Sequence, residues 1–149
     1  MATWTDLERE AATIAAEGRR LLEARGHGEA LLATVRADAE PRIHPISIGI
    51  VDGELVAFII GASPKYRDLA EDGRYALHSH QDAAAPDELA LRGRARLLTD
   101  PARRAAAAAV WSFEPDGTYA LFAFDIDSAI LGQRGADEWP PRYTRWTAR

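Results

Sequence analysis

Hydrophobic and polar residues alternate over several short runs of the chain, which is the pattern of strands with one buried face. The run 89–98 has arginine at 92, 94 and 96 and apolar or small residues between them. The run 41–51 is rich in isoleucine, a residue that favours strands. We expect six strands, over residues 30–36, 41–51, 54–60, 74–80, 89–98 and 118–126.

The pair Asp52-Gly53 separates two of these runs. Both positions of a two-residue type I′ turn need positive φ, and Asp-Gly meets that need. We therefore expect 41–51 and 54–60 to form a tight antiparallel hairpin.

Residues 5–25 have the period of an amphipathic helix and are followed by Gly26, a common stop. Thr5 and Glu8 have the spacing of a capping box at its start. We expect the N-terminal segment 1–27 to pack on the rest of the fold.

Two further helices are expected. Ser63 and Pro64 suit the cap and first residue of a short helix that ends before Gly73. Asp100-Pro101 opens an alanine-rich helix that reaches about Trp111.

Because the strands follow one another through hairpins, without regular βαβ alternation, the chain is predicted to be mainly β: an antiparallel barrel with peripheral helices, in one domain over 1–149.

Composition narrows the chemistry. The chain has no cysteine, so disulfides, Cys-ligated metals and thiol nucleophiles are excluded. A formal charge of −5 opposes binding to nucleic acid. No apolar run approaches the roughly 18 residues of a membrane span, so we expect a cytoplasmic protein with no membrane partner.

Arginine supplies 17 of the 18 basic residues, and Lys65 is the only lysine. Lys65 and Arg67 fall in the first turn of the helix that Ser63 begins, where the helix dipole is already positive. A bound anion, such as a phosphate, makes this arrangement favourable. The alternative is a solvated helix in which Lys65 pairs with Asp68 and Arg67 pairs with Glu71.

The strand 41–51 offers further contacts. Arg42 is a second candidate for the phosphate, with a solvated strand-end arginine as the alternative. Pro45 cannot donate a ladder hydrogen bond, so we expect an edge or bulge there. His44, Pro45 and Ser47 then line a cleft.

Two other clusters carry weaker signals. His78 and His80 share one face of a strand, but the sequence has no metal-binding pattern around them, and we predict no metal site. The arginines at 92, 94 and 96 are typical of a solvated face, although at a subunit interface they could hold an acidic ligand.

The segments LATVR, EPRIHPISIGIVDGELVAFII, ASPKYRDLAEDGRYALHSH and DELALRGRARLLTD together resemble the pyridoxamine 5′-phosphate oxidase-like proteins, which are flavin-binding split β-barrels. The most specific parts are Ser63-x-Lys65-x-x-Asp68-Leu69, similar to the family's phosphate loop, and the Pro-Arg-x-x-Pro-x-Ser strand. Asp68 stands where the family more commonly has asparagine.

The resemblance implies a homodimer of six-stranded split barrels that bind FMN between subunits. It places the phosphate at Ser63, Lys65 and Arg42, the isoalloxazine along residues 45–47, and the tail 136–149, with Trp139, at the cofactor groove. The cofactor-binding residues predicted on this basis are Arg42, His44, Pro45, Ile46, Ser47, Ala62, Ser63, Lys65, Leu69 and Trp139.

The function implied is a flavin-dependent oxidoreductase that moves a hydride to or from a small-molecule substrate. Such chemistry belongs to the cofactor, and the sequence identifies no catalytic side chain. Two alternatives are an F420-dependent reductase of the same fold and a non-enzymatic protein that binds a cofactor or a haem-type ligand.

Overall fold

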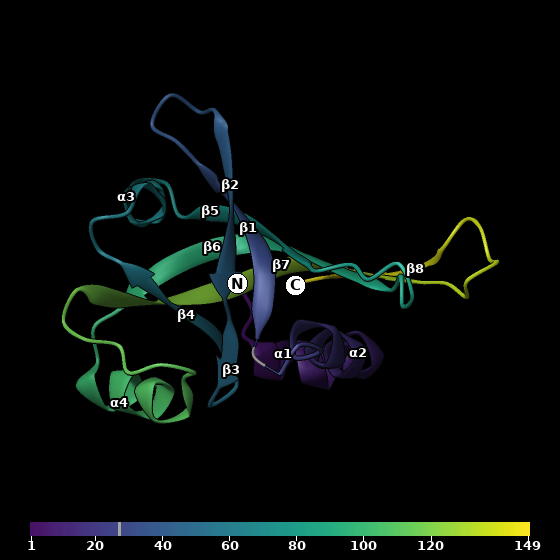
Figure 1. The fold of residues 1–149 in the computed structure, drawn as a ribbon, viewed down its shortest axis with the longest axis horizontal. Helices are drawn as coiled ribbons and strands as arrows, with labels where there is room; N and C mark the ends of the chain where they lie inside the picture. Colours follow the sequence, from purple (N-terminus) through teal and green to yellow (C-terminus); the bar gives the residue numbers. More distant parts are fainter. Residues whose placement is uncertain (27) are drawn as a thin grey trace.

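The computed structural model describes residues 1–26 and 28–149, and Figure 1 shows their arrangement. His27, the last residue of the expected N-terminal segment, lies outside the described residues. The elements, in chain order, are α1 (Trp4–Glu10), α2 (Ala12–Leu22), β1 (Glu29–Val35), β2 (Pro41–Ser47), β3 (Gly49–Val51), β4 (Glu54–Ile60), α3 (Pro64–Glu71), β5 (Arg74–Ser79), β6 (Glu88–Leu98), α4 (Pro101–Val110), β7 (Tyr119–Gln133) and β8 (Arg142–Thr147).

The strands form one antiparallel sheet in the order β2-β1-β5-β6-β7-β4-β3, with β8 added on β7. The two ends of this path, β2 and β3, are consecutive pieces of chain separated only by Ile48. The sheet therefore curls back on itself, and the predicted mainly β split barrel with peripheral helices is confirmed.

The described strands number eight, and not six. One extra strand arises because 41–51 divides at Ile48, whose N–H donates to the carbonyl of Gly28 at 2.8 Å and whose side chain is buried. The other arises because the tail forms β8, which pairs with the far half of β7. β8 and the far half of β7 together form an arm that projects from the body on the side away from α3 (Figure 1).

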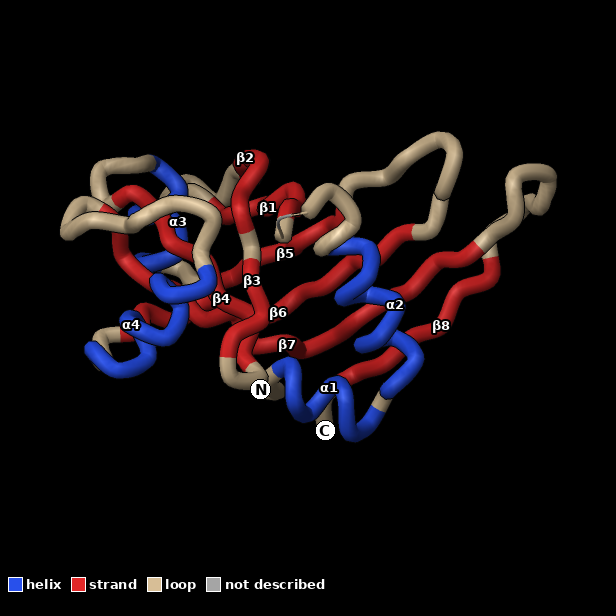
Figure 2. Tube along the Cα trace, turned by 60° about the horizontal axis from the view of Figure 1, so that its bottom comes forward, coloured by secondary structure: helices blue, strands red, loops and turns tan. Residues whose placement is uncertain are grey.

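The core lies inside the curled sheet and beneath α1 and α2. α2 packs against β6 and β7, and α1 packs against β4 and β7. Figure 2 shows the two helices beside these strands. Buried residues of the helices and of the strands form one cluster. The largest fully buried side chains include Trp4, Leu7, Ile14, Leu32, Leu77, Leu91, Phe122 and Phe124.

The N-terminal segment differs from its prediction in two respects. It is two helices, because Ala11 leaves the helical conformation at φ −145°. The capping box is formed by Thr3 and Asp6, and not by Thr5 and Glu8. The backbone N–H of Thr5 donates instead to the carbonyl of Gly53 at 3.0 Å, which docks α1 on the β3–β4 hairpin.

That hairpin is confirmed. Asp52 and Gly53 have φ of 50° and 76°, as a type I′ turn requires. A Cβ on Gly53 would lie 2.0 Å from Thr5 Oγ1, so the docked helix also requires glycine here. None of the described helices is long and apolar enough to cross a membrane.

Candidate functional site

The N-terminus of α3 has the cap that the sequence predicts. The Ser63 hydroxyl accepts from the N–H of Tyr66 at 3.3 Å and donates to the carbonyl of Ile60 at 2.6 Å, and Pro64 is the first helical residue. Lys65 is half-buried in the first turn and Arg67 is exposed. Neither cation pairs with a carboxylate in the described part of the chain, so the pairs Lys65–Asp68 and Arg67–Glu71 of the surface-helix alternative are not formed.

Asp68 links α3 to the strands beside it. Its carboxylate is 6% exposed, and Oδ2 accepts from Thr34 Oγ1 at 2.7 Å and from Arg42 Nε at 2.9 Å. The contact fixes Arg42 of β2 next to α3, the helix that carries Lys65 in its first turn. The sequence marks Asp68 as a departure from the family's asparagine and as a possible partner of Lys65. Its contacts with Thr34 and Arg42 are not evident there, because these residues are 34 and 26 positions away in the chain.

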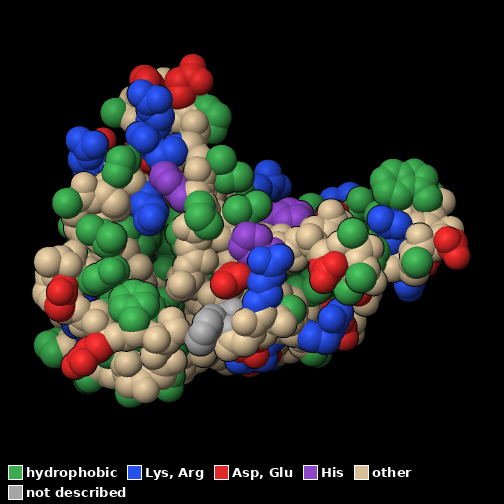
Figure 3. All heavy atoms as spheres, in the orientation of Figure 1, with side chains coloured by type: hydrophobic (Ala, Val, Ile, Leu, Met, Phe, Trp, Pro, Cys, Tyr) green, Lys and Arg blue, Asp and Glu red, His purple; other side chains and the backbone are tan. Residues whose placement is uncertain are grey.

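Basic side chains gather with a histidine over α3 and the outer part of β2 (Figure 3). A hollow of about 270 Å³ lies between the β1–β2 turn and α3. Arg36, Arg42 and Arg67 line it, together with three carboxylates. Asp38 pairs with Arg36 and Asp68 pairs with Arg42, whereas Arg67 and Glu71 form no ion pair among the described residues. Lys65, in the first turn of α3, stands outside the lining of this hollow.

His44 stands beside this basic cluster on β2. Its Nε2 is buried and has no hydrogen-bond partner among the described residues. Burial lowers the pKa of the imidazole, and the positive charges of Lys65 and Arg42 lower it further, against a smaller opposite effect of Asp68. His44 is therefore neutral at pH 7, with a ring nitrogen that has no protein partner.

The rest of β2 follows the expected course. β2 is an edge strand of the path, in agreement with the missing N–H of Pro45. Ile46 packs against the core, and Ser47 lines a pocket of about 400 Å³ at the end of the strand. Ala62 is exposed in the turn before α3, whereas Leu69 is buried in the core at 2% exposure.

Trp139 is not brought together with the other predicted site residues. It lies in the connection between β7 and β8, 79% exposed, with the Arg134 guanidinium 5.7 Å from its ring centre. This end of the arm is far from α3 in the same chain (Figure 1). Trp139 can reach such a site only in a second copy of the chain.

Arg96 of the arginine run and His78 of the histidine pair contact carboxylates of neighbouring strands. Arg96 bonds Glu54 at 2.5 Å and Asp125 at 3.0 Å, and Arg103 of α4 also bonds Glu54. His78 Nε2 lies 3.5 Å from Glu88 on the neighbouring strand. The arginine run is thus divided, since Arg96 joins β6 to Glu54 of β4 and Asp125 of β7, while Arg92 and Arg94 are exposed. Glu54, through Arg103, also links the sheet to α4.

The model of the pyridoxamine 5′-phosphate oxidase family matches residues 15–129. No curated protein is similar enough to the chain to match it. Several solved structures share the fold. A haem-binding protein from Mycobacterium smegmatis is 20% identical with a TM-score of 0.66, over 89% of this chain and 57% of that one.

A protein of the pyridoxinephosphate oxidase family from Clostridium acetobutylicum, related to general stress protein 26, is 16% identical with a TM-score of 0.65, over 89% and 92% of the two chains. The haem storage protein HutZ from Vibrio cholerae is 14% identical with a TM-score of 0.62, over 74% and 88%. These likenesses show the fold, and the family model covers more than half of the sequence. The chain is a member of the pyridoxamine 5′-phosphate oxidase family.

Proposed function

We propose that this chain binds FMN and acts as a flavin-dependent oxidoreductase on a small-molecule substrate. The observation that carries the proposal is the unpaired Lys65 at the N-terminus of α3, the helix to which Asp68 ties Arg42. Lys65 and Arg67 place two cations at the positive end of this helix, which is unfavourable unless an anion is bound there. A phosphate group fits that position.

The residues of the chain divide the work of binding. Lys65 and the first-turn backbone of α3 hold the phosphate, and Arg42 faces it from β2. The edge strand at Pro45 and Ser47 lies along the flavin ring. Bound FMN supplies the hydride chemistry, while the protein orients the ring and lowers the access of water to it. The neutral His44 offers Nε2 as a hydrogen-bonding group next to the phosphate end.

A homodimer completes the site. The outer face of β1, β2, β5, β6 and β7 carries a hollow of about 230 Å³, and Ile43 on this face is 68% exposed. The apolar residues around the hollow are Leu31, Ala33, Ile43, Ala76, Ala90 and Ile130. His78, Arg92 and Ser128 also line the hollow. An exposed apolar patch with polar residues among it is typical of a surface that another chain covers. In a symmetric dimer, the arm of one protomer can bring Trp139 to the site of the other.

Haem binding is the second candidate. The relatives from Mycobacterium smegmatis and Vibrio cholerae are named for haem, and His44 has an unpartnered ring nitrogen beside cations that could pair with propionates. An F420-type deazaflavin, which also carries phosphate, fits the same basic cluster.

Absorbance and fluorescence titrations with FMN, riboflavin, F420 and haem test the proposal. Riboflavin is the matched control because it has the flavin ring but no phosphate. Each charge-assisted contact is worth about 1.5–3 kcal/mol, so FMN should bind roughly 10- to 100-fold more tightly than riboflavin. Equal affinity for the two flavins contradicts the proposal, and saturable binding of haem alone favours the haem candidate.

A further inference from the structure

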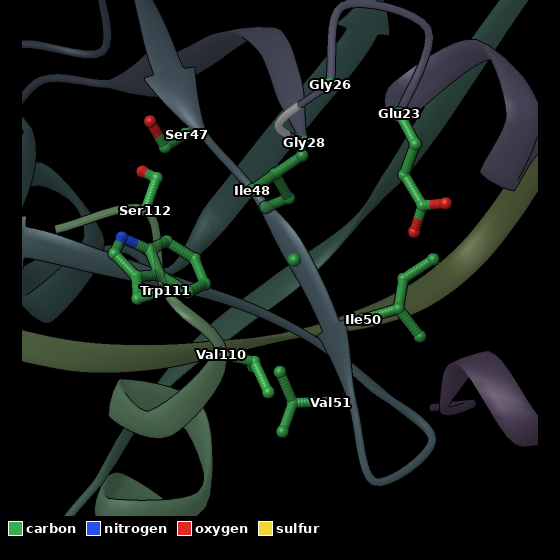
Figure 4. A pocket seen from close by; sticks show the side chains of 11 residues that line it. Glu23, Gly26, Gly28, Ser47, Ile48, Ile50, Val51, Val110, Trp111 and Ser112 are labelled. Carbon is green, nitrogen blue, oxygen red and sulfur yellow. The ribbon is translucent and has the colours of Figure 1, made fainter.

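The pocket that Ser47 lines lies apart from the basic cluster, between the junction of β2 and β3, the end of α2 and the end of α4 (Figure 4). Its volume is about 400 Å³, within the range of pockets for small molecules. Of the residues of β2, the strand proposed to lie along the flavin, only Ser47 is among the described residues that line this pocket. A molecule bound in it would therefore sit next to the reacting end of the proposed site.

Two glycines give this pocket its shape. The ring of Trp111 packs so closely against the backbone of β3 that a Cβ on Gly49 would be 2.8 Å from Trp111 Cζ3. The same ring packs edge-on against Phe58, with centroids 5.1 Å apart. On the other side, the chain at Gly28 runs so close to Ile48 that a Cβ would be 1.6 Å from the Ile48 carbonyl oxygen. The walls are thus held by tight packing on both sides.

Polar groups lie at one edge of the pocket. The N–H at Trp111 Nε1 is buried and has no acceptor among the described residues. The Ser47 and Ser112 side chains stand on the same side as this nitrogen, whereas Ile50, Val51 and Val110 form the opposite, apolar side (Figure 4). A buried donor without a partner costs about 1–3 kcal/mol, and an acceptor that reaches it recovers that cost.

The charge of the pocket differs from that of the α3 cluster. Among the described residues that line it, Glu23, which follows α2, is the one charged residue, and it is exposed and lies 3.5 Å from the Arg19 guanidinium. Since the described lining offers no cation, an anion is disfavoured here, while a neutral or cationic molecule is accepted. Phosphate ligands and the occupant of this pocket are separated by charge.

We propose that this pocket binds an uncharged or cationic planar heteroaromatic molecule, whose edge carries a hydrogen-bond acceptor for Trp111 Nε1. The apolar walls hold the faces of its rings, and Ser47 and Ser112 contact its polar edge. The statement that this pocket is the substrate site of the oxidoreductase rests on the proposed function. The statement that the pocket binds such a molecule rests on the pocket alone.

The donor is covered in the free protein, so binding must move it. Trp111 is the C-cap of α4, with an extended backbone, and is the first residue of a bend at 111–113. The proposed binding therefore includes a shift of this bend, which turns Nε1 toward the pocket and gives the donor its acceptor. Binding should then alter the environment of this indole more than that of the other three.

A titration with quinoline, followed by the indole N–H signals in a ¹H–¹⁵N correlation spectrum, tests the inference. Quinoline is neutral at pH 7.5 and presents a ring nitrogen as acceptor. Trp4 Nε1 is also buried and unpartnered, so its signal is an internal control. Indole, which has a donor and no ring acceptor, and quinoline-4-carboxylate, which is anionic, are the matched ligands.

We expect quinoline to move the Trp111 signal saturably while the Trp4 signal stays in place. Quinoline should bind more tightly than either matched ligand. Trp111→Phe keeps most of the ring but removes the donor, and should raise the dissociation constant of quinoline about two- to tenfold. Trp146→Phe, which removes an indole bonded to Glu10 elsewhere in the fold, should leave it unchanged.

The variant Lys65→Ala separates this inference from the proposed function. Loss of FMN binding with unchanged quinoline binding supports both. If Lys65→Ala keeps full FMN affinity while quinoline still moves the Trp111 signal, the pocket stands and the cofactor proposal fails. A Trp111 signal that quinoline does not move at millimolar concentration, or equal binding of quinoline by Trp111→Phe, overturns the inference.

Discussion

Asp68→Asn should weaken the fold slightly and strengthen the binding of a phosphate ligand. The carboxylate is 6% exposed and accepts two hydrogen bonds through Oδ2, from Thr34 and Arg42. An asparagine oxygen can accept the same two bonds but carries no charge. A hydrogen bond to a charged group is worth about 1.5–3 kcal/mol and a neutral one about 0.5–1.5 kcal/mol. The free energy of unfolding should therefore fall by about 1 kcal/mol, which lowers Tm by about 2–4 °C.

The effect on ligand binding has the opposite sign. In the native protein, the charge of Arg42 is balanced by Asp68 at 2.9 Å. In the variant, Arg42 keeps its position through the amide oxygen, while its charge is no longer compensated. At a partly exposed site, one unit charge a few ångströms away contributes about 1 kcal/mol, so the dissociation constant of FMN should fall roughly fivefold.

Thermal melts and FMN titrations of three variants check this reasoning. Asp68→Ala leaves the Thr34 hydroxyl, which is 1% exposed, without its acceptor, and should cost more stability than Asp68→Asn. Asp38→Asn is the matched control, because it removes a carboxylate from an exposed pair with Arg36 and should change Tm little. An Asp68→Asn protein that binds FMN more weakly than the parent refutes the argument that Asp68 compensates the charge of Arg42.

Three further predictions concern the turn, the dimer and His44. Gly53→Val should lower the free energy of unfolding by about 2 kcal/mol or more, because φ is 76° and a Cβ would meet Thr5. Gly117→Val, at a position with open space around it, is the control. An unchanged Tm in Gly53→Val would mean that the turn tolerates a side chain. Ile43→Glu should shift the protein from dimer to monomer in light scattering, and a parent that is already monomeric at micromolar concentration would exclude the dimer. Because the folded pKa of His44 lies below its unfolded value of about 6.5, the stability contribution of His44 should be complete above pH 6.5 and fall as the pH drops toward the folded pKa. His44→Gln should flatten this part of the Tm profile, and an identical slope would contradict the lowered pKa of this partly buried ring.

Local signals in the sequence were enough for much of the fold. The type I′ turn at Asp52-Gly53 and the cap of α3 at Ser63 depend on residues within a few positions of one another, and both are confirmed. The division of the strand at Ile48 depends instead on a hydrogen bond to Gly28, which no local pattern contains. The same holds for β8, since its pairing with β7 comes from tertiary structure and its sequence contains no clear alternation.

The candidate site shows the same limit. Lys65 stands out in the sequence because it is the only lysine, and its position beside a helix cap points to an anion. The contact of Asp68 with Arg42 and Thr34 joins three elements, and so it appears only in the folded chain. The pocket at Trp111 is formed by the close approach of α4 to Gly49, and a tryptophan at the end of a predicted helix gave no signal of it.

The most direct test of the account compares FMN and riboflavin on the parent, Lys65→Ala and Lys65→Arg. If the ammonium holds the phosphate, Lys65→Ala should raise the dissociation constant of FMN by roughly one to two decades and leave riboflavin unchanged, with Tm preserved because alanine suits a helix. Lys65→Arg should recover part of the FMN affinity, since it keeps the charge but not the shape. Equal FMN affinity in Lys65→Ala and the parent, or an equal loss for both flavins, would contradict a phosphate site at the N-terminus of α3.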